Sequence, residues 1–277
     1  MTLYIVPTPI GNLEDITLRA LRILREVALI AAEDTRTSRV LLDHYNIIKP
    51  MVSYHEHNKI EQIDDILEML LSGADVALIS DAGTPGLSDP GYELVNACLR
   101  AGIEVVSLPG ATAAVTALVA SGLPTDRFTF LGFLPRKKHA LMALLQEYQQ
   151  APETLIAYES PYRLLETLDV ICEVMGHSRR VCVAREISKM FEEYFRGTAA
   201  EAREYFSQEP VRGEVTVLIG GMPRESTAWT EERVRAELEK RLAAGESRNA
   251  AAKAIAAESG WKKRDIYALK PSGGSHQ

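Results

Sequence analysis

The stretch DVALISDAGTPGLSDPG, residues 75–91, decides the fold of this chain. Its first half is an apolar run that ends at Ile79, which is typical of a strand buried on both faces. Its second half is rich in glycine and proline, residues that fix a loop and bring its backbone groups close to a ligand. Ligands of parallel α/β sheets gather at the carboxyl ends of strands. The stretch therefore predicts a buried strand followed by a ligand-binding loop.

Working outward, three more apolar runs read as strands of the same sheet: LYIV (3–6), VALIAAED (27–34) and EVVSLPG (104–110). Helical patterns lie between them. Ile63, Ile66, Leu67 and Leu70, for example, fall on one helix face, and that helix is expected to end at Gly73. Strands separated by helices predict a mostly parallel, helix-covered sheet.

A second set of apolar runs follows: FTFLGFLP (128–135), ETLIAYES (153–160), RVCVARE (180–186) and EVTVLIGG (214–221). Helices are expected near 136–150 and 162–175, and a helix within 109–123 joins the two sets. The sequence thus predicts two α/β domains, 1–118 and 119–222.

The rest of the chain, 223–277, is expected to form a small basic domain. It reads as three short helices separated by glycines, which resembles a helix-turn-helix bundle whose basic face could meet phosphates. The net charge of the chain is −7, but from Arg224 onward eleven Lys/Arg stand against eight Asp/Glu. A small packing appendage is the alternative, and the pattern does not decide between them.

Composition sets broad limits on the class of protein. Of 277 residues, 46% are hydrophobic and 25% charged, which is ordinary for globular domains. Three scattered cysteines favour neither a disulfide framework nor a zinc site. No apolar run reaches the roughly 18 residues of a membrane span, and no signal peptide is recognisable. We therefore expect a soluble, cytoplasmic protein.

Three loops at strand ends share the same character. They are Pro7–Asn12, Ser80–Gly91 and Pro109–Ala114, and side by side they would line a neutral pocket with backbone groups. Such a pocket suits adenosine and a methionine moiety better than a triphosphate. Neither a P-loop nor a GxGxxG follows the first strand. The alternative is that these are merely tight turns.

A series of motifs carries a family resemblance. They are PTPIGNLEDIT (7–17), AAEDTR (31–36), SDAGTP with SDPG (80–91), PGATAA (109–114), DRFTFLGFLPR (126–136), YESPYR (158–163), ARE (184–186) and GE (213–214). In this order they resemble the ribosomal RNA small subunit methyltransferase I family, cytidine-2′-O-methyltransferases of the tetrapyrrole methylase superfamily. They cover nearly the whole α/β part of the chain.

The resemblance implies a homodimer that binds S-adenosylmethionine in the cleft between two α/β domains and methylates small-subunit ribosomal RNA. Carried onto this sequence, the residues that bind the cofactor are Pro9, Ala82, Gly83, Thr84, Leu87, Ser88, Thr112, Ala113, Phe133, Tyr158 and Val215. One departure is that the usual GDP tripeptide reads Gly83-Thr84-Pro85. The aspartate that marks tetrapyrrole enzymes is missing, which disfavours a precorrin substrate.

Carboxylates at strand ends are candidates for the catalytic base. Glu33, Asp34 and Glu186 lie beside Arg36 and Arg185, which could bind RNA phosphate. We single out Asp34, Arg36 and Glu186 as catalytic candidates. A structural ion pair is the alternative for each.

Two basic runs are candidates for RNA binding. They are Arg136, Lys137 and Lys138 after the FLGFLP strand, and Lys262, Lys263 and Arg264 after Trp261. A solvated surface is the alternative. His55 and His57 form an HxH pair, but no third ligand is spaced to help them, so we expect no metal.

Two rival functions remain open. One is an enzyme of the same fold that methylates a tetrapyrrole or a modified protein side chain, against which the basic tail argues. The other is a non-enzymatic RNA-binding or ribosome-assembly protein, against which the complete set of pocket loops argues. Binding of S-adenosylmethionine separates an enzyme from the non-enzymatic protein.

Overall fold

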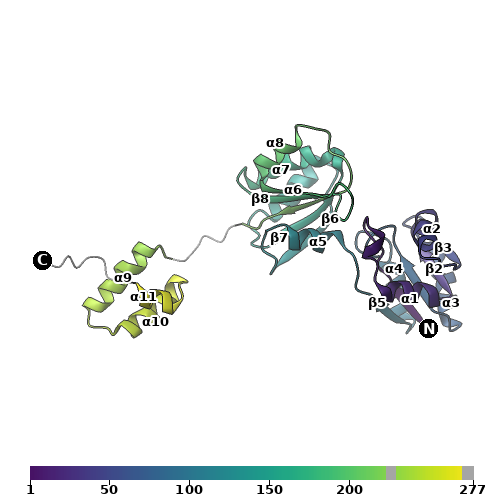
Figure 1. The fold of residues 1–277 in the computed structure, drawn as a ribbon, viewed down its shortest axis with the longest axis horizontal. Helices are drawn as coiled ribbons and strands as arrows, with labels where there is room; N and C mark the ends of the chain where they lie inside the picture. The colour runs from purple at the N-terminus through teal and green to yellow at the C-terminus, as the bar shows by residue number, and fades with distance from the viewer. Residues whose placement is uncertain (223–228, 270–277) are drawn as a thin grey trace. The chain divides into compact units, whose positions relative to one another are not determined.

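The computed structural model describes residues 1–222 and 229–269 of the chain (Figure 1). The chain divides into two compact units, Met1–Met222 and Pro223–Gln277. The first unit contains two five-stranded sheets, and the described part of the second is helical. No helix within the described ranges is long and apolar enough to cross a membrane.

The first sheet is entirely parallel, with the strand order β3-β2-β4-β1-β5. Its strands are β1 (Thr2–Ile5), β2 (Leu29–Ala32), β3 (Met51–Ser53), β4 (Val76–Ile79) and β5 (Glu104–Ser107). From β1 the chain continues to β2 and then to β3 at one edge of the sheet. It returns to β4, between β2 and β1, and continues from there to β5 at the other edge. The loops after β1 and β4 are therefore neighbours at the point where the order reverses, which is where such sheets bind ligands.

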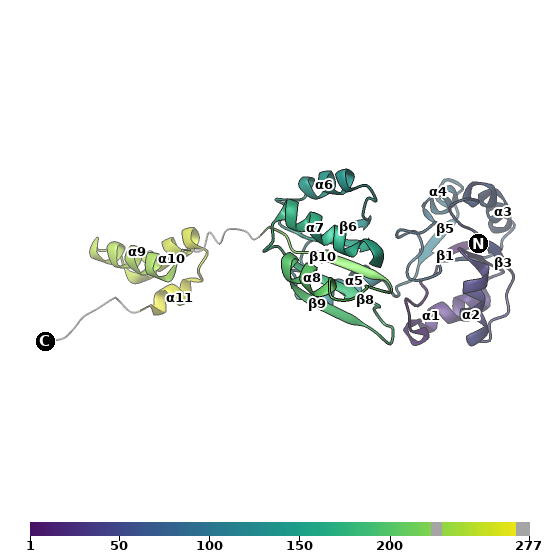
Figure 2. The ribbon, with the colours of Figure 1, turned by 90° about the horizontal axis from the view of Figure 1, so that it is seen from above.

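Helices cover both faces of the first sheet, as Figure 2 shows. They are η1 (Leu13–Asp15), α1 (Leu18–Glu26), α2 (Thr35–His44), α3 (Lys59–Leu71) and α4 (Tyr92–Arg100). Helices α1 and α2 contribute Leu24 and Leu42 to one core, while α3 and α4 contribute Leu70 and Leu94 to the other. Thr17 caps the N-terminus of α1, and its side chain accepts a hydrogen bond from the amide of Ala20 at 3.0 Å.

The second sheet is mixed, with the strand order β6-β7-β10-β8-β9. Its strands are β6 (Phe128–Phe133), β7 (Thr154–Glu159), β8 (Arg180–Arg185), β9 (Glu193–Thr198) and β10 (Val215–Ile219). Only β6 and β7 pair in parallel, and the other neighbours are antiparallel. The rule that strands joined by a helix run in the same direction holds in both sheets, because in the second sheet β6 and β7, β7 and β8, and β9 and β10 each share one direction. The second sheet is mixed because the short connection from β8 to β9 contains no helix and reverses the chain, a strand pair that the apolar pattern did not predict.

The helices of the second sheet are α5 (Ala113–Ala120), α6 (Lys138–Glu147), η2 (Pro161–Arg163), α7 (Leu164–Met175) and α8 (Ala199–Phe206). Helices α6, α7 and α8 lie over one face, where they form the largest core, and α5 lies on the other face (Figure 1). The joining helix expected from the sequence is α5, and it packs on the second sheet through Ala114, Ala117 and Leu118. The predicted domain boundary at 118/119 falls inside this helix.

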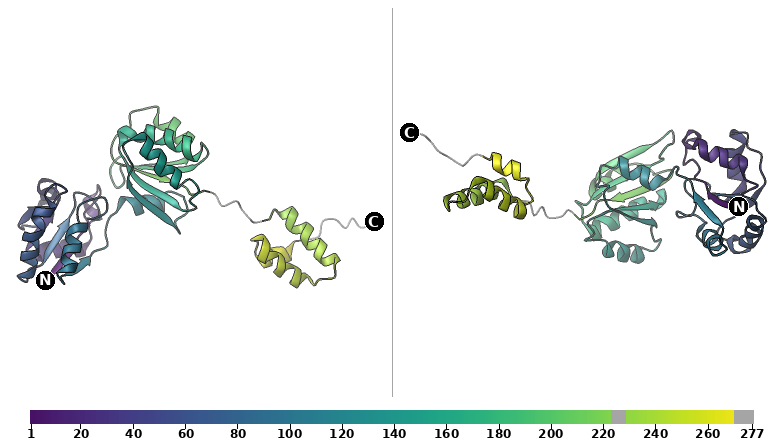
Figure 3. Two further views of the ribbon diagram at one scale, coloured as in Figure 1. Left: turned by 180° about the vertical axis from the view of Figure 1, so that it is seen from behind. Right: turned by 90° about the horizontal axis from the view of Figure 1, so that it is seen from below.

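The described residues of the second unit form three helices, as the sequence predicts: α9 (Glu231–Ala243), α10 (Arg248–Ser259) and α11 (Lys263–Ala268) (Figure 3). The alanine-rich α10 packs through Ala251, Ala252 and Ile255 against the other two. The predicted domain 223–277 also includes 223–228 and 270–277, which lie outside the described residues.

Candidate active site

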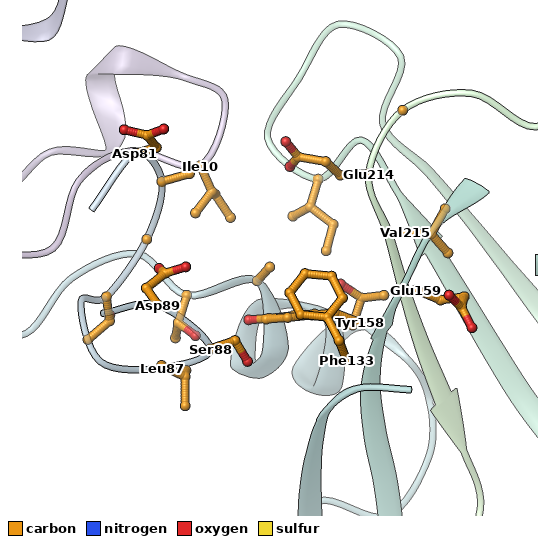
Figure 4. Close-up of a pocket in the computed structure, with 18 of the residues that line it drawn as sticks. Ile10, Asp81, Leu87, Ser88, Asp89, Phe133, Tyr158, Glu159, Glu214 and Val215 are labelled. Atoms are coloured by element: carbon orange, nitrogen blue, oxygen red, sulfur yellow. The ribbon is translucent and has the colours of Figure 1, made fainter. Parts of the chain in front are cut away.

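A cavity of about 480 Å³ lies in the first unit, with walls from both sheets (Figure 4). One wall is formed by the loops after β1, β2 and β4. The opposite wall is formed by the ends of β6 and β7 and by the segment from Gly213 to Thr216. The cavity therefore lies at the carboxyl edge of the first sheet, next to the point where its strand order reverses.

The structure brings ten of the eleven predicted cofactor-binding residues together around this cavity: Ala82, Gly83, Thr84, Leu87, Ser88, Thr112, Ala113, Phe133, Tyr158 and Val215. The eleventh, Pro9, is buried and does not line it, whereas its neighbour Ile10 does. Residues around the cavity that the sequence did not single out include Ile187, which follows β8 and carries no recognisable signal.

Hydrogen bonds tie the three predicted loops to one another. Thr8 and Gly83 exchange backbone hydrogen bonds at 2.9 and 3.0 Å, which joins the loop after β1 to the loop after β4. The Thr84 hydroxyl donates to the Ala111 carbonyl at 3.1 Å, which joins the second loop to the third. A Cβ on Gly110 would overlap the ring of Pro7, so the first and third loops also touch. The loops thus form one preorganised wall.

The loop after β4 requires unusual backbone angles. Gly83 and Gly86 have φ of +80° and +81°, values that glycine adopts at little cost. Ser88 has φ of +68°, which is uncommon for a residue with a Cβ and occurs here at the cavity. The cluster of glycines that the sequence displays is therefore a geometric requirement of this wall.

The opposite wall is aromatic. The rings of Phe133 and Tyr158 meet edge to face with their centroids 5.5 Å apart, and the Phe130 ring also meets Tyr158 edge to face, with centroids 5.1 Å apart. Burial raises the pKa of Tyr158, so its phenol stays protonated at neutral pH. Phe133 is 66% exposed although it lines the cavity. This wall can hold a flat apolar group or a cation against its rings.

Three carboxyl groups line the first wall: Glu33, Asp81 and Asp89 (Figure 4 shows the two aspartates). Burial raises the pKa of Asp89 to about 6, and the charge of Glu33 adds to that effect. Burial also raises the pKa values of Glu33 and Asp81, although a backbone hydrogen bond opposes the rise in each case. A raised pKa gives a carboxyl group a higher affinity for a proton, which favours a role as general base.

The predicted catalytic residues Asp34 and Arg36 lie next to this cluster but do not line the cavity. Asp34 caps the N-terminus of α2 and forms a bidentate pair with Arg36, with distances of 3.1 and 2.7 Å. The hydrogen bonds from Arg36 lower the pKa of Asp34 to about 2. The side chain of Arg36 is 90% exposed. The pair is ionised, solvated and linked to the cavity through the Asp34 amide, which donates to Asp81 at 3.1 Å.

Glu186, the third predicted catalytic residue, faces a different cavity beside β9. It accepts hydrogen bonds from the Glu214 amide and the Lys189 ammonium, both at 2.9 Å. Partial burial alone would raise the pKa of Glu186, but these two donors outweigh it and the net effect lowers the pKa. A Cβ on Gly213 would overlap the Glu186 side chain, so this pairing also fixes the segment that enters the main cavity.

The two predicted RNA-binding runs occupy different surroundings. Arg136 and Lys137 are exposed between β6 and α6, and Lys138, the exposed first residue of α6, pairs with Glu173 at 3.2 Å. Lys262, Lys263 and Arg264 lie at the start of α11 in the helical unit, where Arg264 pairs with Asp265 at 3.0 Å.

Trp261, which precedes the second run, packs in the small core. It donates through Nε1 to the Trp229 carbonyl at 2.6 Å. Within the described residues no cluster of three or more His, Cys, Asp or Glu could hold a metal ion.

The fold and this cavity define the class of enzyme. Residues 2–203 match the family model described as Tetrapyrrole (Corrin/Porphyrin) Methylases, and the chain is a methyltransferase of that fold. Two proteins named ribosomal RNA small subunit methyltransferase I, from Synechocystis sp. and Halalkalibacterium halodurans, are each 46% identical over 96% of this chain, which covers 96% and 93% of their lengths. The chain belongs to the ribosomal RNA small subunit methyltransferase I family.

Solved structures support the fold independently. A uroporphyrin-III C-methyltransferase from Thermus thermophilus, complexed with S-adenyl homocysteine, superposes with a TM-score of 0.57 and 22% identity, covering 79% of this chain and 97% of that one. The predicted family, fold class and enzyme class are thereby confirmed.

Proposed function

We propose that this methyltransferase transfers the methyl group of S-adenosylmethionine to the ribose 2′-hydroxyl of a cytidine in the 16S RNA of the small ribosomal subunit. The observation that carries the proposal is a cavity that combines a carboxylate wall with an aromatic wall. The names of relatives that are 46% identical over nearly the whole chain support ribosomal RNA as the acceptor.

The residues around the cavity fit S-adenosylmethionine, the cofactor that the sequence predicts. The cavity volume of about 480 Å³ lies within the usual range for small-molecule sites. Glu33, Asp81 and Asp89 complement a ligand that carries positive charge on a sulfonium and an ammonium group. Phe133 and Tyr158 offer rings to an adenine or a sulfonium. The loop backbone at Ala82–Thr84 can supply hydrogen-bonding groups to the polar edges of such a ligand.

When bound, the cofactor supplies a methyl group on a positively charged sulfur. The chain contributes a cavity that can hold the ribose hydroxyl in line with this methyl group. It must also accept the hydroxyl proton, and a carboxylate at the cavity can do so. Glu33 is the candidate base with the best position, because it lines the cavity and burial raises its pKa. We propose that Asp34, Arg36 and Glu186 act beside it, by placing Asp81 and the segment that contains Gly213.

RNA contacts are proposed for both basic runs. Arg136 and Lys137 are exposed close in sequence to Phe133, which lines the cavity, so they suit the phosphates beside the target nucleotide. Lys262, Lys263 and Arg264 would contact phosphates elsewhere on the RNA. We further propose that the enzyme acts as a homodimer in the cytoplasm, which sedimentation equilibrium and cell fractionation would test.

The test of function is transfer of labelled methyl from S-adenosylmethionine to small ribosomal subunits from cells that lack this protein, followed by nuclease mapping. We expect a single labelled 2′-O-methylcytidine in the 16S RNA. Tetrapyrrole precursors are the matched alternative acceptor, because they are substrates suggested by the name of the wider family. Transfer to a tetrapyrrole, with no transfer to RNA, would refute the proposal.

A further inference from the structure

The segment after β7 presents an exposed aromatic ring beside the cavity. Tyr162 is 94% exposed and lies in η2, directly after Pro161, which lines the cavity. Its ring has no aromatic or cation–π contact with any other residue of the described ranges. The ring therefore adds little to the packing of the chain, and single exposed rings need no special explanation by themselves. What distinguishes Tyr162 is the way its backbone is held.

A buried carboxylate fixes the segment that contains Tyr162. The Glu159 side chain is 1% exposed and accepts hydrogen bonds from the Ser160 amide at 2.7 Å and from the Thr167 hydroxyl at 2.6 Å. It also forms an ion pair with Arg163 at 3.2 Å. Breaking such a buried network is costly, so the turn around Tyr162 is rigid.

The same network joins this turn to the first basic run. Arg163 donates to the carbonyl groups of Leu134 and Pro135, at 3.3 and 2.5 Å. The next two residues, Arg136 and Lys137, are exposed and form no ion pair within residues 1–222 and 229–269. The Glu159–Arg163 ion pair therefore fixes the backbone on either side of the cavity rim: one side carries the outward-facing ring, and the other carries two cations that form no ion pair in the described ranges.

We propose that Tyr162 is a stacking platform for the unpaired nucleotide next to the one that is methylated, with Arg136 and Lys137 on the phosphates of that strand. This inference rests on the proposed function. A nucleotide that enters an enclosed site must leave its stack, and its neighbour then loses a stacking partner. A rigid aromatic side chain replaces that partner at low entropic cost, whereas the flexible cations contact the backbone.

The experiment compares equilibrium binding to small ribosomal subunits from cells lacking this protein, measured by filter binding over a salt series. Tyr162→Ala should weaken binding by roughly tenfold or more, because stacking on an aromatic ring is worth about 1–3 kcal/mol per base. Tyr162→Phe should restore binding, since it keeps the ring, and Tyr162→Leu should not. The salt slope should stay unchanged, because no phosphate contact is lost.

Arg136→Ala combined with Lys137→Ala should instead reduce the salt slope by roughly 0.7 for each phosphate contact removed. Ile48→Ala is the matched control: Ile48 is 90% exposed and lies between α2 and β3, away from the cavity lining, so its removal should change nothing. Affinity for S-adenosylmethionine should be equal in all variants, which excludes misfolding as the cause.

If the wild-type protein methylates RNA but the Tyr162→Ala variant binds the subunit as tightly as wild type, the stacking role is overturned and the proposed function stands. A wild-type protein that neither binds nor methylates the subunit would overturn the proposed function, and this inference with it. Equal losses for Tyr162→Leu and Tyr162→Phe would also overturn the stacking role, because they would show that the ring itself is not recognised.

Discussion

Asp89 is the residue whose charge the fold disfavours most clearly at the cavity, and its replacement by asparagine gives a prediction with a defined pH dependence. Burial raises the pKa of Asp89 from 3.8 to about 6. Because the pKa of Asp89 is higher in the folded state than in the unfolded state, the folded state binds more protons than the unfolded state at pH values between the two pKa values. Stability therefore falls as pH rises from about 4 to above 6, and the full penalty is present at pH 8.

The magnitude follows from the size of the shift. A shift from 3.8 to about 6 corresponds to about 3 kcal/mol at 1.36 kcal/mol per pKa unit. Asp89 is only half-buried, so solvent screening reduces this, and we expect about 1–2 kcal/mol. Asp89→Asn removes the charge at similar volume. The variant should be more stable than wild type by that amount at pH 8, and the difference should shrink toward zero near pH 4.

Urea unfolding of both proteins at several pH values between 4 and 8 measures this difference. Binding of S-adenosylmethionine gives the complementary result, because a cationic ligand prefers the ionised carboxylate. Wild-type affinity should fall as pH drops below about 6, whereas the affinity of Asp89→Asn should be weaker at pH 8 and nearly independent of pH. A stability difference that stays constant from pH 4 to pH 8 would refute the reasoning, since it would not come from a titrating charge.

Three further substitutions test other parts of the structure. Glu33→Gln should lower kcat, measured at saturating cofactor, by about 10²–10⁴, because the variant cannot accept a proton; a kcat equal to that of wild type would exclude Glu33 as the base. Gly110→Ala should destabilise the chain by about 1–3 kcal/mol in urea unfolding, because its methyl group would overlap the Pro7 ring; a variant as stable as wild type would contradict the close approach of these two loops. Thr17→Ala should cost about 1 kcal/mol in the same assay through loss of the α1 cap, and Thr17→Ser should recover most of it.

The sequence predicts the first sheet well because its strands are continuous apolar runs, as in β4, where all four residues are buried. It misses β3 and β9 for the opposite reason. Both lie at sheet edges, and their residues are mostly half-buried, so neither continuous hydrophobicity nor strict alternation marks them. The antiparallel pairing of β10 between β7 and β8 is a long-range choice that no local pattern encodes.

The cofactor loops are predictable because their requirement is local. Positive φ angles and close backbone approach select glycine, and that selection is visible in the sequence at Gly83 and Gly86. The opposite wall has no such local requirement. Ile187 lines the cavity because β8 ends there, and Tyr162 is held by Glu159, whose burial depends on α7 packing over β7. Residues placed by tertiary packing leave no pattern along the chain.

The choice among carboxylates shows why adjacency in sequence is a poor guide to a catalytic base. Glu33 and Asp34 are neighbours, yet their environments shift their pKa values in opposite directions. Asp34 caps α2 and is neutralised by Arg36, so it is a weak base, although the same pair fixes the amide that donates to Asp81. Glu33 lies at the cavity, no cationic side chain in the described part of the chain is bonded to its carboxylate, and burial raises its pKa. A pH–rate profile that lost its acidic limb in Glu33→Gln but kept it in Asp34→Asn would follow from this division, and the reverse pattern would contradict it.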